Sequence, residues 1–409
     1  MRMPAWLTNP KRLILMLGLS TVFLVSAVWI SRSQNYMLNG DFFESWLAGR
    51  ALWTGVELYN PDSWGPAHIL YGNVYDRNAV YPFPPVFALT FTILGILPLS
   101  AAAVIWVFAS LWLITLSVIS LGRLSGLSSS VQYLLPTLAG VFIFRPAMVT
   151  LRNGQNGALF LFILVAIGLL WQRERWFSGG FFLSFLLLRP NTGLPLVGMI
   201  GLWLLLTHNG RAIGGIFSGG AFILIISQIM SPLWIDAWMG VGNNKLFNTF
   251  GYHPSLWGLV GLLSGHNLTT VIWIGSAMAL AVTVGTALWL RSSADKGAPL
   301  AAIAFSIPSG LLVAPYIWAY DQVFLIFSIV VCVGALIKQE APYLISATLH
   351  IFLSIAALAL LAVAMAVGED TPSGILSALV VGVVYITFRT KSRSSSSRRP
   401  TWWASRWAG

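Results

Sequence analysis

The residues of this sequence that could do chemistry are confined to short polar stretches between long apolar runs. They are Asn39-Gly40-Asp41, Arg152-Asn153-Gly154-Gln155-Asn156, Arg189-Pro190-Asn191, Asn243-Asn244-Lys245, His253, Tyr316, Tyr320 and Asp321. Carboxylates, cations, amides, phenols and imidazoles of this kind exchange protons and bind anions. An ionisable group at membrane depth costs roughly 2.5–3.5 kcal/mol and is therefore a candidate for function.

The composition places these stretches in a membrane protein. Of the 409 residues, 57% are hydrophobic and 9% are charged, whereas a soluble domain is about 25% charged. The apolar runs are roughly 15–25 residues long, which suits helices that span about 30 Å of hydrocarbon. They are longer than the alternating segments of about 10 residues in a β-barrel. We therefore predict an all-α polytopic bundle that forms a single domain over residues 1–390.

The apolar runs predict helices over residues 13–30, 84–98, 101–121, 131–148, 157–171, 177–188, 190–206, 212–230, 268–290, 299–314, 318–337, 344–367 and 373–388. The first run is interpreted as a retained membrane span, because it is long for a signal peptide and lacks a small-residue cleavage site. The two runs around Arg189-Pro190 form either a pair of short helices or one kinked helix.

The distribution of charge predicts the orientation of this bundle. With both termini in the cytoplasm, 16 of the 23 Lys and Arg but only 3 of the 12 Asp and Glu lie inside. The cytoplasmic side then carries +13 and the outer side −2, in agreement with the positive-inside rule. An even number of crossings follows, about 12 (11–13), and we expect the short run 84–98 to be re-entrant. The polar stretches then share the outer face, where one wet cavity would explain them together.

Two long loops face outward in this arrangement, residues 31–83 and 231–267. Residues 41–53 (DFFESWLAGRALW) carry apolar side chains at helical spacing, which predicts an amphipathic helix in the membrane interface. Residues 391–409 are rich in Ser and Arg and are expected to form a disordered cytoplasmic tail that faces lipid headgroups rather than nucleic acid. The single cysteine, Cys332, excludes an internal disulfide.

Several segments, in their order and spacing, resemble the family-87 glycosyltransferases of the GT-C superfamily. These are polyprenyl-phosphate-mannose-dependent mannosyltransferases and their relatives. The segments are GDFFESWLAGRALWTGVELYNP (40–61), YPFPPVFALTFTILGILPLSAAAVIWVF (81–108), RNGQNGALFLFILVAIGLL (152–170), LLLRPNTGLPL (186–196) and APYIWAYDQ (314–322). The resemblance implies an enzyme at the outer face of the plasma membrane. It would transfer a sugar, mannose by family default, from a polyprenyl-phosphate donor to a lipid or glycan acceptor, with inversion and without a metal or other cofactor.

The resemblance also implies roles for single residues. Asp41 matches the family's carboxylate after the first span and is the candidate general base. Arg189 stands where the family usually has a lysine before a proline, and would bind the lipid phosphate. The further candidate substrate-binding residues are Arg152, Gln155, Asp321, Tyr316, Tyr320, Lys245 and His253. Tyr316 and Tyr320 stand where members often carry a histidine, and this departure leaves the donor open.

Purely structural interpretations compete with these roles. Asp41 could cap a helix in a capping box with Glu44, Arg189 could snorkel to the interface, and Asp321 could be favoured by a helix dipole. Two other functions are open for the whole chain: a lipid or polysaccharide transporter such as a flippase, and a catalytically inactive partner subunit of the same fold. The clustering of polar residues on one face and the lack of an internal repeat favour the enzyme over the transporter.

Overall fold

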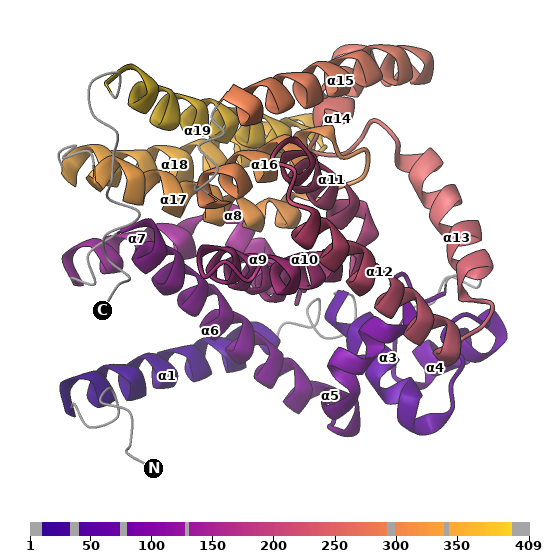
Figure 1. The fold of residues 1–409 in the computed structure, drawn as a ribbon. Helices are drawn as coiled ribbons and strands as arrows, with labels where there is room; N and C mark the ends of the chain where they lie inside the picture. Colours follow the sequence, from indigo (N-terminus) through magenta and orange to yellow (C-terminus); the bar gives the residue numbers. More distant parts are fainter. Residues whose placement is uncertain are drawn as a thin grey trace.

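The described part of the chain is all helical, as predicted, in the computed structural model shown in Figure 1. The structure describes residues 10–32, 41–73, 80–126, 131–292, 299–338 and 343–394, without the side chains of 10–15, 131–135, 241–248, 292, 338, 343–353 and 389–394. The helices are α1 (Pro10–Ser31), α3 (Asp41–Thr54), α4 (Pro61–Leu70), η1 (Pro85–Phe91), α5 (Thr92–Ile96), α6 (Leu99–Ser125), α7 (Val131–Ile143), α8 (Arg145–Arg152), α9 (Gly157–Gln172), α10 (Trp176–Leu183), η2 (Ser184–Leu188), α11 (Pro190–Leu206), α12 (Gly210–Met230), α13 (Trp234–Thr249), α14 (Leu256–Leu263), α15 (Leu268–Ser292), α16 (Pro299–Val313), η3 (Ala319–Phe324), α17 (Leu325–Lys338), α18 (Tyr343–Val367), η4 (Thr371–Ser373) and α19 (Gly374–Ser394).

Several of these helices make the chain a membrane protein. Five segments of the described residues are long and apolar enough to cross a bilayer: Leu99–Ser125, Gly210–Met230, Leu268–Arg291, Ala319–Ile337 and Thr371–Phe388. Shorter apolar helices, such as Gly157–Gln172 and Pro299–Val313, accompany them. Large exposed apolar side chains, among them Trp29, Phe217 and Trp273, lie on α1, α12 and α15, where lipid would cover them. The number of crossings and the re-entrant course of 84–98 remain predictions.

The helices break where proline or a short polar stretch interrupts the apolar pattern. The predicted helix 131–148 divides at Phe144 into α7 and α8, because Pro146 lies in the first turn of α8. The runs around Arg189-Pro190 form separate helices, since Arg189 has φ −123° and ψ 79° between η2 and α11. Of the two arrangements predicted there, the pair of short helices is the one observed.

Close packing of small residues fixes the segment that leads to Arg189. Gly215 and Gly219 lie one turn apart on α12, and a Cβ at either would overlap the backbone of α10, at the carbonyls of Phe177 and Phe181. Small residues at this spacing let membrane helices approach closely. Because α10 continues through η2 to Arg189, the α10–α12 contact sets the place of that arginine.

Helix α3 lies where the sequence predicts a helix, but protein covers most of its surface. Phe42, Phe43, Trp46 and Leu47 are each at most 2% exposed, and the small residues of its middle turn are buried as well. Gly49 meets η1 so closely that a Cβ would overlap the Phe91 carbonyl. The apolar face of α3 therefore packs against the protein, and only its last turn, at Leu52 and Trp53, exposes large apolar side chains.

The predicted outer loops contain further helices. Helix α4 lies in 31–83, and α13 and α14 lie in 231–267. Figure 1 shows α3, α4 and α5 gathered at one end of the molecule, with α13 along its edge. At the C-terminus, α19 extends to Ser394, so residues 391–394 of the predicted disordered tail are helical. The rest of that tail lies outside the described residues, as do Asn39 and Gly40.

The centre of the bundle is built by α16 and α17. Every residue of α16 from Ala302 to Leu311 is buried, and so is every residue from Asp321 to Val333. Helix α16 packs against α11, α15, α17 and α19. This central hairpin carries at its turn the polar stretch 316–321, and so holds those polar side chains against the surrounding helices.

Candidate active site

Arg189 and Asp321 form a buried ion pair at the junction of η2 with α11. Arg189 Nη2 lies 2.8 Å from Asp321 Oδ1, and their side chains are 5% and 0% exposed. Asp321 Oδ2 accepts the Trp318 backbone N–H at 2.8 Å, at the start of η3. Asp321 thus combines the predicted helix-terminal role with a charge pair. Its burial keeps Asp321 away from solvent.

Arg189 keeps unused hydrogen-bonding capacity. Its Nε and Nη1 atoms are buried and have no hydrogen-bond partner among the described residues. Its guanidinium carbon lies 5.1 Å from the centre of the Tyr320 ring. A buried guanidinium with free donors is costly unless an acceptor reaches it. Each of these two free N–H groups could donate a hydrogen bond to an anionic group such as a phosphate.

Asp41 lies beside this pair at the start of α3. Its side chain is half-buried, and the Tyr320 hydroxyl donates a hydrogen bond to its carboxylate. Burial raises the pKa of Asp41 from 3.8 to about 6, with a further increase from Glu44, while Arg189 and the Tyr320 hydrogen bond act in the opposite direction. The carboxylate is therefore mostly ionised at neutral pH, yet takes a proton more readily than an ordinary aspartate.

The structure does not form the capping box that was the alternative interpretation of Asp41. Glu44 Oε1 contacts His68 Nε2 at 3.2 Å instead of the backbone at the helix start. The Asp41 side chain contacts Tyr320 of η3. Both carboxylates of the first turn of α3 are thus directed at other elements.

The turn between α8 and α9 joins α3 and η3. Thr150 Oγ1 donates to the Tyr320 carbonyl at 3.1 Å, and Asn156 Nδ2 lies 3.5 Å from Ser45 Oγ of α3. Gln155 is buried within this turn, and its amide nitrogen has no partner among the described residues. Arg152, in contrast, is exposed at the end of α8. Of the two predicted site residues in this segment, Gln155 is buried in the turn beside α3 and η3, whereas Arg152 lies at the surface.

Tyr316 and His253 extend the group through aromatic contacts. The His253 ring is 4.3 Å from that of Tyr316 and 5.1 Å from that of Trp318, which stacks on Tyr320 at 6.4 Å. Burial lowers the pKa of His253 to about 4, so the ring is neutral and supplies no positive charge at neutral pH. Lys245 lies in α13, and its side chain is outside the described residues.

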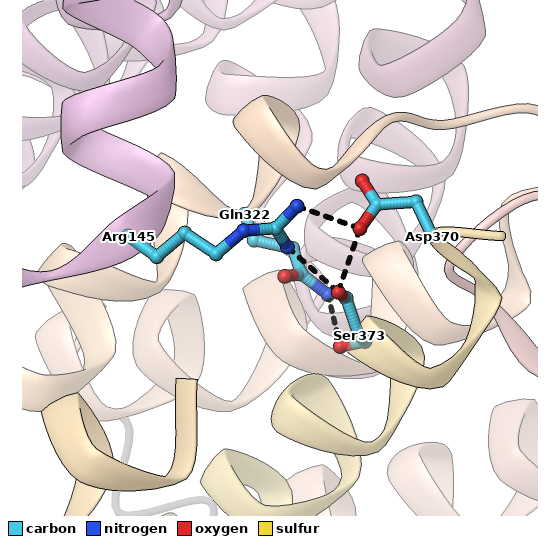
Figure 2. Close-up of polar contacts among 4 residues, drawn as sticks. All are labelled: Arg145, Gln322, Asp370 and Ser373. Atoms are coloured by element: carbon cyan, nitrogen blue, oxygen red, sulfur yellow. Dashed lines mark hydrogen bonds and ion pairs between the residues drawn. The ribbon is translucent and has the colours of Figure 1, made fainter. Parts of the chain in front are cut away.

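Element η3, which carries Tyr320 and Asp321, is anchored on its other side by a second polar cluster (Figure 2). Gln322 Nε2 donates to the Ser373 carbonyl at 2.6 Å. Arg145, at the start of α8, donates to Asp370 at 2.7 Å and to Ser373 Oγ at 2.8 Å. The cluster ties α8, η3 and η4 together and thereby fixes the direction in which Tyr320 and Asp321 point.

Two residues of the site were not singled out from the sequence. The Thr192 side chain interacts with Asp321, and Trp318 supplies both a backbone donor and a ring. Thr192 lies three residues after Arg189 in the first turn of α11, so helical spacing is the signal that could have found it. Trp318 lacked a signal, because tryptophans near helix ends are common in membrane proteins. Among the described residues, no three or more His, Cys, Asp or Glu side chains gather in a way that could hold a metal ion.

Fold and site together define a helical integral membrane protein in which helix junctions bring a half-buried carboxylate, a phenol and a buried cation into contact. The profile of glycosyltransferase family 87 matches residues 81–315, more than half of the chain. The chain belongs to this family, and the resemblance noted in the sequence is confirmed. Comparisons with curated proteins and with solved structures give no match. The matched range contains Arg189 and Gln155, while Asp41, Tyr320 and Asp321 lie outside it.

Proposed function

We propose that this glycosyltransferase transfers a sugar from a polyprenyl-phosphate donor to a hydroxyl group of a lipid or glycan acceptor, with inversion at the anomeric carbon. The observation that carries the proposal is the contact of Asp41, Tyr320, Arg189 and Asp321, which come from three separate elements. Mannose is the sugar that family membership favours. The lipid-linked donor suits a protein with several apolar helices, because its chain would stay in the bilayer.

Each group has a part in the reaction. The Asp41 carboxylate takes the proton of the acceptor hydroxyl while that oxygen attacks the anomeric carbon. The bond between this carbon and the phosphate oxygen breaks, and the electron pair leaves with the lipid phosphate. Arg189 Nε and Nη1 bind the phosphate and stabilise its growing charge. Asp321 holds the guanidinium in place, and the Tyr320 hydroxyl orients the Asp41 carboxylate.

The proposed setting is the plasma membrane, with both termini in the cytoplasm and the site at the outer face. Residues 1–390 act as one domain of about 12 crossings. The predicted charge difference of the two faces supports this orientation. Gln155, Tyr316 and His253 line the sugar side of the site, where their amide, phenol and ring would contact a pyranose. Lys245 and Arg152 are further candidates for contacts with phosphate.

A donor screen tests the proposal. The purified protein, reconstituted in liposomes, is supplied with radiolabelled polyprenyl-phosphate mannose, then with the arabinose analogue, and with a native lipid extract as acceptor. Transfer from one donor, with an inverted anomeric configuration in the product by NMR, is the expected result. A product that retains the donor configuration would contradict the single displacement. Movement of the intact lipid donor across the bilayer without transfer would indicate a flippase, and neither activity would favour an inactive partner subunit.

A further inference from the structure

A second ionisable pair, Glu44 with His68, lies next to the proposed base. Glu44 follows Asp41 by three residues on α3, so both carboxylates lie on the same side of this helix. His68, on α4, is 2% exposed and its Nε2 lies 3.2 Å from Glu44 Oε1. Phe43 and Trp64 enclose the imidazole, with ring centres at 5.3 and 4.9 Å. The mechanism above uses neither residue.

Hydrogen-bond geometry fixes how many protons this pair holds. His68 Nδ1 lies 2.9 Å from the Trp64 carbonyl oxygen, which can only accept, so Nδ1 carries a proton. The contact of Nε2 with Glu44 then needs another proton, on the imidazole or on the carboxyl group. In either form the pair has no net charge. The pKa of His68 is raised: burial lowers it, but the hydrogen bond and charge of Glu44 outweigh that effect, which favours imidazolium with carboxylate.

The proton shared by Glu44 and His68 affects Asp41, because Asp41 interacts with several charged groups. Asp41 is influenced by Arg189 at the start of α11, by Tyr320 and Asp321 on η3, by Tyr316, and by Glu44 on its own helix. Tyr81 also interacts with Glu44. Glu44 Oε2 is buried and has no hydrogen-bond partner among the described residues. Without the His68 proton, an uncompensated carboxylate would therefore lie one helical turn from the base.

We propose that Glu44 and His68 are positioning residues that share one proton, and that this neutral pair sets how readily Asp41 accepts a proton from the acceptor hydroxyl. The inference rests on the proposed role of Asp41 as the base. The proposal predicts that removing both partners and removing His68 alone have different effects on Asp41. Replacing both partners by neutral residues leaves the local charge nearly unchanged, whereas removing the histidine alone leaves the Glu44 charge beside Asp41.

The test is the pH dependence of transfer in four reconstituted proteins: wild type, Glu44→Gln, His68→Gln and the double variant. Glutamine at 68 keeps a hydrogen-bond donor toward Glu44 but has no charge. We expect the acidic limb of His68→Gln to move to higher pH by about half to one unit, the order expected for two like charges one helical turn apart. Glu44→Gln should move the limb to slightly lower pH, and the double variant should behave like Glu44→Gln. Asp62→Asn, which removes an exposed carboxylate from α4, should leave the limb in place.

An unshifted limb in His68→Gln, or a double variant that stays shifted upward, would overturn the proposal. If His68→Gln does not fold, Glu44→Gln decides, since an upward shift of its limb contradicts the neutral pair. Infrared titration of the Asp41 carboxylate, taken as the difference between each protein and its Asp41→Asn counterpart, measures the same shifts without turnover. Absent transfer in wild type with the expected infrared shifts would therefore refute the proposed function and retain the pair. Normal transfer in wild type without these infrared shifts would support the proposed function and refute the role of the Glu44–His68 pair.

Discussion

The guanidinium of Arg189 lies 2.8 Å from the carboxylate of Asp321, and neither side chain is more than 5% exposed. Asp321 is thus the charge partner of Arg189. Asp41, which is half-buried and interacts with Tyr320, is the more exposed of the two carboxylates and is the proposed base. We therefore propose different tasks for the two acids, and the following variants separate them.

Breaking the buried ion pair should destabilise the protein. Asp321→Asn leaves the Arg189 charge uncompensated, and the loss of one partner of a buried pair costs about 3–5 kcal/mol. Thermal unfolding in detergent should show a clear loss, with reduced transfer. The double variant Arg189→Met with Asp321→Leu should unfold at a higher temperature than Asp321→Asn, because no buried charge remains. Equal destabilisation of both proteins would contradict a paired charge.

Arg189→Lys tests whether the unused guanidinium donors bind the donor phosphate. Lysine keeps the charge but cannot place donors at both the Nε and the Nη1 position, and a hydrogen bond to a charged group is worth about 1.5–3 kcal/mol. The KM for the lipid-phosphate donor should rise by about tenfold or more, measured by initial rates in liposomes. Arg173→Lys, at an exposed position, is the matched control and should retain the wild-type KM. An unchanged KM in Arg189→Lys would place the phosphate elsewhere.

Asp41 should reduce the stability of the protein at neutral pH. Its pKa is about 6 in the folded protein against an ordinary 3.8, so the folded state holds the proton more tightly than the unfolded state. The tighter proton binding of the folded state stabilises the protein fully below about pH 4, and this stabilisation is lost as the pH rises through about 6. Asp41→Asn should therefore unfold at a higher temperature than wild type at pH 7.5, and the difference should vanish near pH 4. A difference that is constant over this range would refute the raised pKa.

The place of α3 depends on the absence of a side chain at Gly49. A Cβ there would overlap the Phe91 carbonyl, so Gly49→Ala should push α3 away from η1 and displace Asp41. We expect a loss of about 1–3 kcal/mol in stability together with reduced transfer. Gly220→Ala on α12, where a Cβ meets no atom within 4 Å, should change neither. Normal activity in Gly49→Ala would show that the α3–η1 contact does not position the base.

Much of this arrangement could be predicted from the sequence, because apolar run length determines where membrane helices begin and end. The helical spacing of apolar residues predicted a helix at 41–53, and at Arg189-Pro190 the sequence left open a pair of short helices or one kinked helix. The contacts of side chains were harder, since they depend on which junctions meet in space. The pairing of Arg189 with Asp321 joins positions more than 130 residues apart, and no local pattern encodes it. For the same reason Arg152 looked equivalent to Arg189, although the structure leaves it exposed.

Helices α4, α13 and α14 were missed for a related reason. Their sequences contain Gly, Pro or Asn, which are typical of loops, and α4 and α14 are also short. Contacts with neighbouring elements stabilise them, for example the hydrogen bond from Trp238 Nε1 to the Pro82 carbonyl at 2.9 Å. Tertiary packing rather than intrinsic propensity accounts for such helices.

The central claim is that Asp41 takes the proton of the acceptor, and single-turnover transfer from the labelled lipid-phosphate donor tests it most directly. Wild type, Asp41→Asn and Asp62→Asn are compared at pH 7.5 after each is shown to be folded. We expect Asp41→Asn to lose about 10²–10⁴-fold in rate, the usual contribution of a general base, while donor binding persists and Asp62→Asn matches wild type. Transfer by Asp41→Asn at the wild-type rate would contradict the claim and assign the proton to another group.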